Sequence, residues 1–311
     1  MMGNDLVSIL IPVYNRKHIV GETIESAINQ TYEHIEIIIS DNCSTDGTWE
    51  VLLKYAEIDN RIKLFRNDEN IGPVRNWKKC LDQATGKYVK ILWSDDWMNH
   101  DFIEKALLLF DDETAFVLSG YSITDGIKSK NSTFKKEYKT DYYLKHICTH
   151  NRLQFPVSPG AAIFRKSDVD KYLYIKSVPN NDNLDSLKNG AGNDLLLFLF
   201  VANNYKKISC TPGVDNFFRI HSSSFSVSDD NIYLYYYWAI LYYIIKSTDY
   251  HLENIFKMNL WFTIQRDKTK FLKSVFIASD YRINSIRNVL EFSTFAITKI
   301  AFSFLNIINK L

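Results

Sequence analysis

The 311-residue sequence contains only four cysteines, Cys43, Cys80, Cys148 and Cys210, and they are widely separated. They form no CxxC pair. This spacing argues against a structural zinc site and against a disulfide framework, and it is typical of a reducing compartment. We therefore expect a cytoplasmic location.

Two nucleotide-binding motifs are also missing. No GxGxxG follows the first predicted strand and no GxxxxGK[ST] is present, so neither a dinucleotide fold nor a P-loop is indicated. The formal net charge is +1, which gives no reason to expect a nucleic-acid partner. No apolar run reaches the roughly 18 residues of a spanning helix, and residues 1–5 show no signal-peptide pattern.

The composition is that of a globular protein, with 46% hydrophobic and 23% charged residues. Short apolar runs alternate with segments of helical periodicity through the first 93 residues. This rhythm predicts an α/β fold with right-handed crossovers and a parallel sheet. The predicted strands are residues 6–12, 35–40, 62–65 and 88–93, and the predicted helices include residues 20–30 and 74–83.

Two adjacent carboxylates, Asp95 and Asp96, follow the fourth predicted strand and precede a predicted helix at residues 101–110. Open α/β folds bind ligands at the carboxyl edge of the sheet. Neighbouring carboxylates repel each other unless a positive charge lies between them, and a hard divalent ion bridged to a diphosphate meets that need. Taken alone, the pair also fits a solvated turn that caps the next helix.

Polar residues follow two other predicted strands at the same edge. Residues 12–16 form a loop after the first strand, and Asp41 and Asn42 end the second. We expect both loops to lie beside residues 94–96, because the carboxyl ends of parallel strands meet at one edge of a sheet.

Four segments, in order, resemble the signatures of family 2 glycosyltransferases. Residues 8–15 (SILIPVYN) are similar to the family's opening strand, and residues 40–48 (SDNCSTDGT) to its second-strand signature. Residues 70–76 (NIGPVRN) and 86–96 (GKYVKILWSDD) resemble the run into its acidic metal-binding motif. The segments keep the family's order and spacing over about 100 residues, which is more specific than any single motif.

The resemblance implies a GT-A-like fold: a Rossmann-type, mostly parallel sheet flanked by helices. It also implies a nucleotide-diphosphate sugar donor, Mn²⁺ or Mg²⁺, and an inverting mechanism. The implied catalytic domain covers residues 1–225, with a donor half at 1–120 and an acceptor half at 121–225. Residues 226–311 are then a C-terminal helical appendage. Trp93 departs from the family pattern, because it stands where the first Asp of an Asp-x-Asp-Asp motif is often found.

The same resemblance implies roles for individual residues. Asp96 holds the metal ion against the diphosphate, while Asp95 and Asp41 contact the ribose or the base. The other residues expected to bind the donor are Pro12, Val13, Tyr14, Asn15, Arg16, Asn42, Arg75, Ser94 and Arg219.

Asp194 opens a predicted helix after a polar loop at residues 177–192, which is a lid or merely a flexible segment. From local sequence it is a first-turn acid that the helix dipole favours and keeps ionised. In the resemblance, an acidic residue at the head of this helix is the catalytic base. Further along, residues 217–221 resemble the family's arginine-x-histidine element, where His221 is either a metal ligand or structural.

Two other segments have open interpretations. Residues 124–140 are polar and lysine-rich, which predicts a solvated loop. Residues 159–165 predict a strand with small residues, which either leave room for an acceptor sugar or allow close packing.

The C-terminal region is apolar and basic. Residues 232–245 carry no charge and predict a buried or interfacial helix. Residues 266–311 contain eight basic and three acidic side chains, a net charge of +5, and residues 288–311 predict an amphipathic helix. A basic amphipathic tail favours an anionic membrane surface, so the location could be peripheral on the inner face of the cytoplasmic membrane. Packing on the catalytic domain or in a homodimer competes with that reading.

Together these features predict a single-sugar transfer to a glycan or lipid-linked oligosaccharide in surface polysaccharide assembly, such as O-antigen or capsule. One alternative is a sugar-nucleotide pyrophosphorylase, but residues 12–15 lack its Gly-rich first loop. Another is a non-catalytic nucleotide- or carbohydrate-binding protein, against which Asp96 and Asp194 together count.

Overall fold

The structure is a computed structural model that describes residues 4–148, 155–180, 184–188, 190–221 and 232–247. The chain divides into two compact units, residues 1–256 and residues 257–311, and every described residue belongs to the first. The sequence placed the end of the catalytic domain at residue 225, whereas this first unit continues beyond α9 (Ile232–Ser247).

The N-terminal part alternates strands and helices as the sequence predicts. Its elements are β1 (Val7–Val13), α1 (Val20–Ile28), β2 (Ile35–Asp41), α2 (Thr48–Ile58), β3 (Ile62–Arg66), α3 (Pro73–Gln83) and β4 (Tyr88–Ile91). Strand β1 pairs in parallel with both β2 and β4, and β2 pairs in parallel with β3. Every residue of β1 and β2 is buried, as expected of apolar strands covered on both faces.

The second part of the sheet mixes directions. Its elements are β5 (Trp97–Met98), α4 (Phe102–Leu107), β6 (Thr114–Thr124), β7 (Ser129–Ser132), β8 (Glu137–Lys139), α5 (Thr140–Cys148), η2 (Pro159–Ala161), β9 (Ala162–Arg165), α6 (Lys166–Tyr172), η3 (Ser186–Lys188), α7 (Asn193–Ala202) and β10 (Lys207–Arg219). The main strand order is β3-β2-β1-β4-β9-β6-β10-β5, with β7 on β6 and β8 on β10. Strand β9 is antiparallel to both neighbours, whereas β10 runs parallel to β6.

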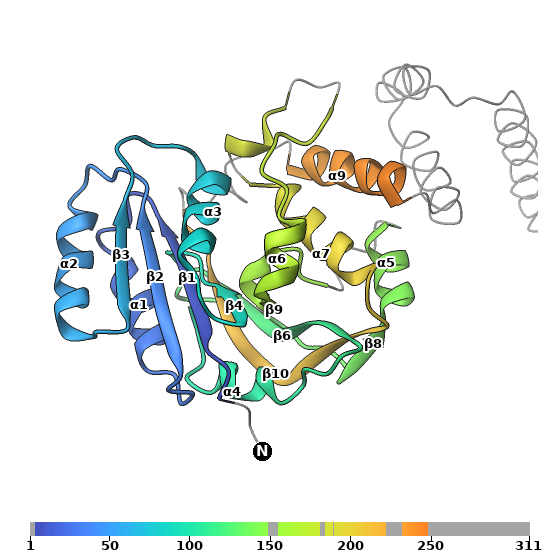
Figure 1. The fold of residues 1–311 in the computed structure, drawn as a ribbon, viewed down its shortest axis with the longest axis horizontal. Coiled ribbons are helices and arrows are strands. Elements are labelled where there is room, and N and C mark those ends of the chain that lie inside the picture. Colours follow the sequence, from blue (N-terminus) through green and yellow to red (C-terminus); the bar gives the residue numbers. More distant parts are fainter. Residues whose placement is uncertain (1–3, 149–154, 181–183, 189, 222–231, 248–311) are drawn as a thin grey trace, which may run out of the picture. The chain divides into compact units, whose positions relative to one another are not determined.

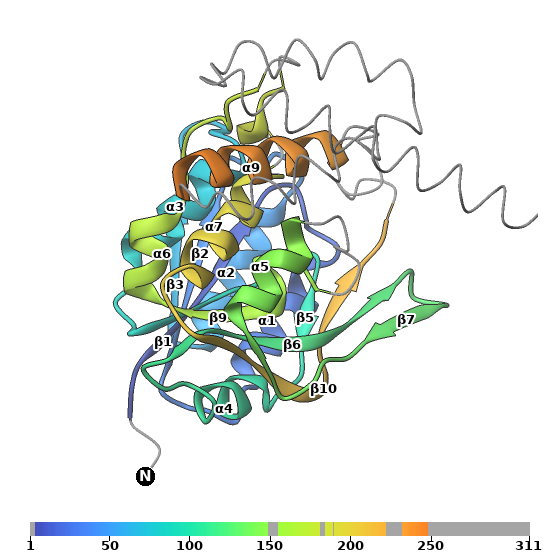
Figure 2. The same ribbon diagram turned by 90° about the vertical axis from the view of Figure 1, so that its right-hand side faces the viewer.

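Helices cover this sheet (Figure 1). Helix α3 packs on β1 and β2, while α7 packs against α6, β6 and α9. Figure 2 shows α9 lying across α7, on which it packs. No helix among the described residues is both long and apolar enough to cross a bilayer.

Three predicted elements differ from the structure. Residues 124–140 were predicted as a loop, but they include strands β7 and β8. The residues of these strands are mostly exposed and polar, so they lack the alternation of apolar and polar residues that predicts a strand. The acidic pair leads into the short strand β5 before α4 begins, and α4 is shorter than the predicted helix at residues 101–110. The sequence did not predict strand β10. It singled out only residues 217–221, which overlap the end of this strand, and only by their family resemblance.

Candidate active site

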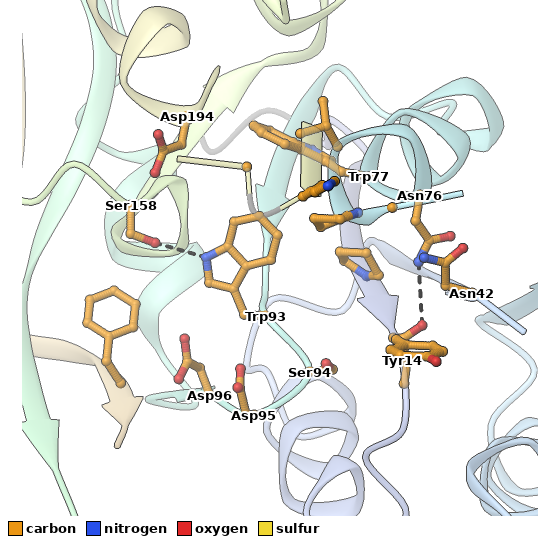
Figure 3. A pocket seen from close by; sticks show the side chains of 18 of the residues that line it. Tyr14, Asn42, Asn76, Trp77, Trp93, Ser94, Asp95, Asp96, Ser158 and Asp194 are labelled. Carbon is orange, nitrogen blue, oxygen red and sulfur yellow. Dashed lines mark hydrogen bonds between the residues drawn. The ribbon is translucent and has the colours of Figure 1, made fainter. Parts of the chain in front are cut away.

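A cavity of about 1330 Å³ lies at the carboxyl ends of β1 and β4 and is closed by α3, η3, α7, α9 and the end of β10. Figure 3 shows its side chains converging from these elements. Eleven of the fourteen residues predicted for the site line it. They are Pro12, Val13, Tyr14, Arg16, Asn42, Arg75, Ser94, Asp95, Asp96, Asp194 and Arg219.

Two of the remaining predicted residues support the walls of the site. Asp41 is fully buried, where it pairs with Arg66 at 3.2 Å and accepts the backbone N–H of Ser44. Asn15 has a positive φ of 51° and accepts the backbone N–H of Thr45 at 2.9 Å. The Asn15 side chain therefore joins the loops after β1 and β2, and the Asp41 side chain joins β3 to the loop after β2.

The acidic pair occupies the turn after β4. The Asp95 carboxylate contacts Arg16 at 3.5 Å and Nε2 of His221, the last predicted residue, at 3.0 Å. Asp96 accepts the backbone N–H of Arg219 at 2.9 Å. Burial and the nearby charge of Asp95 raise the pKa of Asp96 well above its usual range. Asp96 therefore lies buried close to a second carboxylate, and both effects oppose its ionisation.

Arg219 lines the cavity while its side chain is held around this turn. Its Nε donates to the carbonyl oxygen of Asp95 at 3.1 Å, and its guanidinium also pairs with Glu22. The same group lies over the ring of Trp97, 4.8 Å from the centroid. Arg219 thus fixes the shape of the acidic turn through both its backbone and its side chain.

A buried lysine below the acidic turn was not singled out by the sequence. Lys90 is completely buried, and its ammonium donates to the carbonyl oxygen of Gly160 and to Oδ1 of Asn216 at 2.8 Å. Burial lowers the pKa of Lys90 to about 7, an effect that the charge of Asp96 opposes. No sequence signal marks this role, because Lys90 stands in an otherwise apolar strand whose partner Asn216 lies 126 residues away.

Asp194 approaches the cavity from the first turn of α7. Its Oδ1 accepts the backbone N–H groups of Gly192 at 2.8 Å and Leu195 at 2.7 Å, and its Oδ2 accepts the Tyr236 hydroxyl at 3.3 Å. Burial raises the pKa of Asp194 to about 7, although these hydrogen bonds favour the ionised form. The expectation that the helix dipole keeps it fully ionised is therefore wrong: burial is the larger effect.

Aromatic side chains form much of the remaining wall. The sequence did not predict this group, because its members come from six separate elements and share no motif. They are Trp77, Trp93, Tyr121, Phe155, Phe218 and Tyr236. A polar, charged half of the cavity thus adjoins an apolar, ring-lined half, as in many sites for organic ligands.

Carboxylates and imidazole are present at the acidic turn, but a complete metal site is not formed. Among the described residues, no three His, Cys, Asp or Glu side chains are grouped to hold a metal ion. The oxygen donors of Asp95 and Asp96 suit Mg²⁺ or Mn²⁺. A cation there would also relieve the repulsion that raises the pKa of Asp96. The residues present therefore fit a hard divalent ion.

Comparison with known sequences gives a family match. The profile described as "Glycosyl transferase family 2" matches residues 8–173, more than half of the chain. An Escherichia coli protein named UDP-Glc:alpha-D-GlcNAc-diphosphoundecaprenol beta-1,3-glucosyltransferase WfaP is 38% identical over 120 residues. That alignment covers 38% of this chain and 47% of WfaP. An uncharacterized glycosyltransferase of Haemophilus influenzae is 39% identical over 106 residues, covering 34% of this chain and 42% of the relative. The matches thus span about half the length of these relatives.

Comparison with solved structures confirms the predicted GT-A-like fold. S. aureus TarS 1–349 in complex with UDP-GlcNAc superposes with a TM-score of 0.63 at 21% identity, covering 82% of this chain and 71% of TarS. The mannosyltransferase PcManGT from Pyrobaculum calidifontis, in complex with GDP-Man and Mn²⁺, gives 0.54 at 16% identity, covering 94% and 80%. At these identities the likeness concerns the fold alone.

Proposed function

Because the chain belongs to glycosyl transferase family 2, we propose that it transfers one sugar, with inversion, from a nucleotide-diphosphate donor to an acceptor hydroxyl. The observation that carries this proposal is the position of Asp194. It shares one cavity with the acidic turn, yet it comes from the acceptor half of the chain. A base and a donor-binding edge that face a common space are what an inverting transfer requires.

In this proposal the polar half of the cavity binds the donor. The loops after β1 and β2 contribute Tyr14, Arg16 and Asn42 to this cavity, and Arg16 contacts Asp95 at 3.5 Å. Asp96 and Asp95, with His221 beside them, would hold Mn²⁺ or Mg²⁺. Such an ion supplies positive charge to the diphosphate as it leaves.

The residues of the chain itself account for the proton. Asp194 removes the proton from the acceptor hydroxyl while that oxygen forms a bond to the anomeric carbon. The bond from this carbon to the diphosphate breaks on the opposite face, and the nucleoside diphosphate leaves. A pKa of about 7 suits a general base at neutral pH, since both the ionised form and its affinity for a proton are then substantial.

The acceptor class is part of the same proposal. WfaP, by its name, transfers glucose to a diphosphoundecaprenol-linked sugar, and it is 38% identical to this chain over 120 residues. The aromatic half of the cavity offers apolar ring surface next to Asp194, which suits the faces of a sugar. We therefore assign the acceptor to lipid-linked glycans of surface polysaccharide assembly, reached at the inner membrane surface.

The test begins with thermal-shift screening against UDP-, GDP-, dTDP- and CMP-sugars with Mn²⁺. With the donor so identified, Asp194→Asn should lower the rate of metal-dependent donor turnover by about 10²–10⁴-fold, with donor affinity nearly unchanged. Asp170→Asn is the matched control, because Asp170 is an exposed acid of the same half that pairs with Lys166. Near-normal turnover in Asp194→Asn would exclude Asp194 as the base. Absence of binding to every sugar nucleotide in the screen would exclude the proposed transferase activity.

A further inference from the structure

Helix α9 is fixed to both ends of α7. At the N-terminal end, Gly192 has a φ of +90°, and a Cβ there would lie 3.0 Å from the carbonyl oxygen of Tyr235 and 3.4 Å from Cβ of Ala239. This approach requires a residue without a side chain. At the other end, the Tyr243 hydroxyl donates to Oδ1 of Asn203 at 2.9 Å. The face of α9 next to α7 is therefore held close to the start of α7, where Asp194 lies.

The two oxygens of the Asp194 carboxylate have different surroundings. Oδ1 accepts two backbone N–H groups, those of Gly192 and Leu195, and so has both lone pairs engaged. Oδ2 accepts the hydroxyl of Tyr236 at 3.3 Å. Of these three hydrogen-bond donors, only Tyr236 belongs to α9, and Tyr236 also lines the cavity. Oδ2 therefore retains the lone pair with which Asp194 can receive a proton.

We propose that Tyr236 is a positioning residue, which orients Oδ2 of Asp194 toward the acceptor hydroxyl. This inference rests on the proposed role of Asp194 as the base. The hydroxyl donates to the ionised carboxylate and so stabilises it, against the burial that favours the protonated form. Without Tyr236, a smaller fraction of the molecules would hold Asp194 ready to accept a proton at neutral pH. Helix α9 thus becomes part of the catalytic unit.

Other charged groups share the cavity with Asp194. The effect of the Tyr236 hydrogen bond on Asp194 must be distinguished from the effects of these groups. Among the described residues, the hydrogen bonds to the Asp194 carboxylate come from Gly192, Leu195 and Tyr236. The charged and titratable side chains that line the cavity with Asp194 and Tyr236 are Tyr14, Arg16, Arg75, Asp95, Asp96, Tyr121, Asp185, Lys188 and Arg219. Helix α6 adds Lys166, Asp168, Asp170, Lys171 and Tyr172, and α9 adds Tyr235, Tyr242, Tyr243 and Lys246. A variant that changes only the Tyr236 hydroxyl leaves all of these in place.

The experiment measures the titration of Asp194 directly. The full chain is labelled with ¹³C at the aspartate carboxyl carbons, and Asp194→Asn identifies the Asp194 signal. The wild-type midpoint should lie near pH 7. Tyr236→Phe should raise it by about half a unit to one unit, as expected for the loss of one hydrogen bond to a carboxylate. Tyr243→Phe is the matched control, because it removes the same atom from the same helix at a hydroxyl that contacts Asn203.

Three outcomes would overturn the proposal: an unchanged midpoint in Tyr236→Phe, a lowered one, or an equal rise in Tyr243→Phe, which would show a general effect of packing. With an identified donor, the acidic limb of the kcat/KM profile should move to higher pH in Tyr236→Phe by the same amount as the midpoint. A purely structural role would leave this limb in place. If Asp194→Asn proves active, the base assignment fails, whereas the carboxyl titration still decides whether Tyr236 acts on Asp194.

Discussion

The indole N–H of Trp93 donates a hydrogen bond of 2.8 Å to Oγ of Ser158, and so joins the acidic turn after β4 to the segment that leads into η2 (Figure 3). Gly160 lies against the same ring, since a Cβ there would come within 3.0 Å of both Trp93 and Phe218. The sequence left open whether the small residues here make room for a sugar or allow close packing. At Gly160 the structure favours close packing around the indole of Trp93.

Gly160→Ala should therefore displace Trp93 and Phe218. We expect a loss of about 1–3 kcal/mol in the free energy of unfolding, typical of overpacking, and weaker donor binding. Urea denaturation and thermal shift with donor measure the two effects. Gly21→Ala is the control, because the added Cβ meets only the flexible end of Tyr55. Equal stability of the two variants would contradict the packing argument.

Asp96→Asn should weaken Mn²⁺-dependent nucleotide binding by about 10-fold or more, since even outer partners of metal ligands contribute this much. The amide keeps an oxygen for the N–H of Arg219, so the fold should persist. Calorimetric titration with and without Mn²⁺ makes the comparison. Asp101→Asn, at an exposed pair with Lys105, is the control. Unchanged metal-dependent affinity in a folded Asp96→Asn protein would refute the assignment.

The raised pKa of Asp194 predicts a pH dependence of stability. Its pKa is about 7 in the folded protein and about 3.9 in an unfolded chain. Between these values the folded state binds more protons, so the free energy of unfolding falls as pH rises. The Asp194→Asn protein has no carboxyl group to titrate at this position, so its free energy of unfolding should not fall in this way. Urea denaturation should therefore show that its stability, relative to that of wild type, increases from pH 4.5 to pH 8. Parallel curves for the two proteins would show that Asp194 titrates normally.

The basic C-terminal tail predicts membrane binding, although it lies outside the described residues. Removal of residues 288–311 should abolish co-sedimentation with anionic liposomes, because both charge and apolar surface are lost. Neutral liposomes and high salt serve as controls for the electrostatic part. A full-length protein that does not sediment, or a truncated one that still does, would assign the tail to protein contacts such as a homodimer.

The sequence predicted the elements whose patterns are local. Strands β1 to β4 and their helices follow from apolar runs and turn residues. Asp95 and Asp96 follow from a strand end, whereas the role of Asp194 rests on the family resemblance. Strand β10 was missed because Pro212 and Gly213 interrupt it. Its polar residues Asp215 and Asn216 are buried through distant partners: Lys105 pairs with Asp215 at 3.1 Å.

Contacts between distant segments account for the rest of what was missed. Lys90 is a charged residue in an apolar strand, and the sequence does not show that its ammonium is bound by Gly160 and Asn216. Tyr236 belongs to a helix that the sequence placed in a C-terminal appendage, and its packing on α7 brings it to Asp194. Periodicity predicts which face of an element is buried, but not which partner it meets.

The hydrogen bond from the backbone N–H of Arg219 to the Asp96 carboxylate spans 123 residues, and this separation has a consequence for biosynthesis. Strand β4 pairs with β1 on one side, but its other neighbour, β9, is made more than 70 residues later. A nascent chain that ends near residue 120 therefore carries an open sheet edge and an unfinished acidic turn. The donor half should not bind nucleotide when expressed alone, and the ribosome must complete β10 before the site exists.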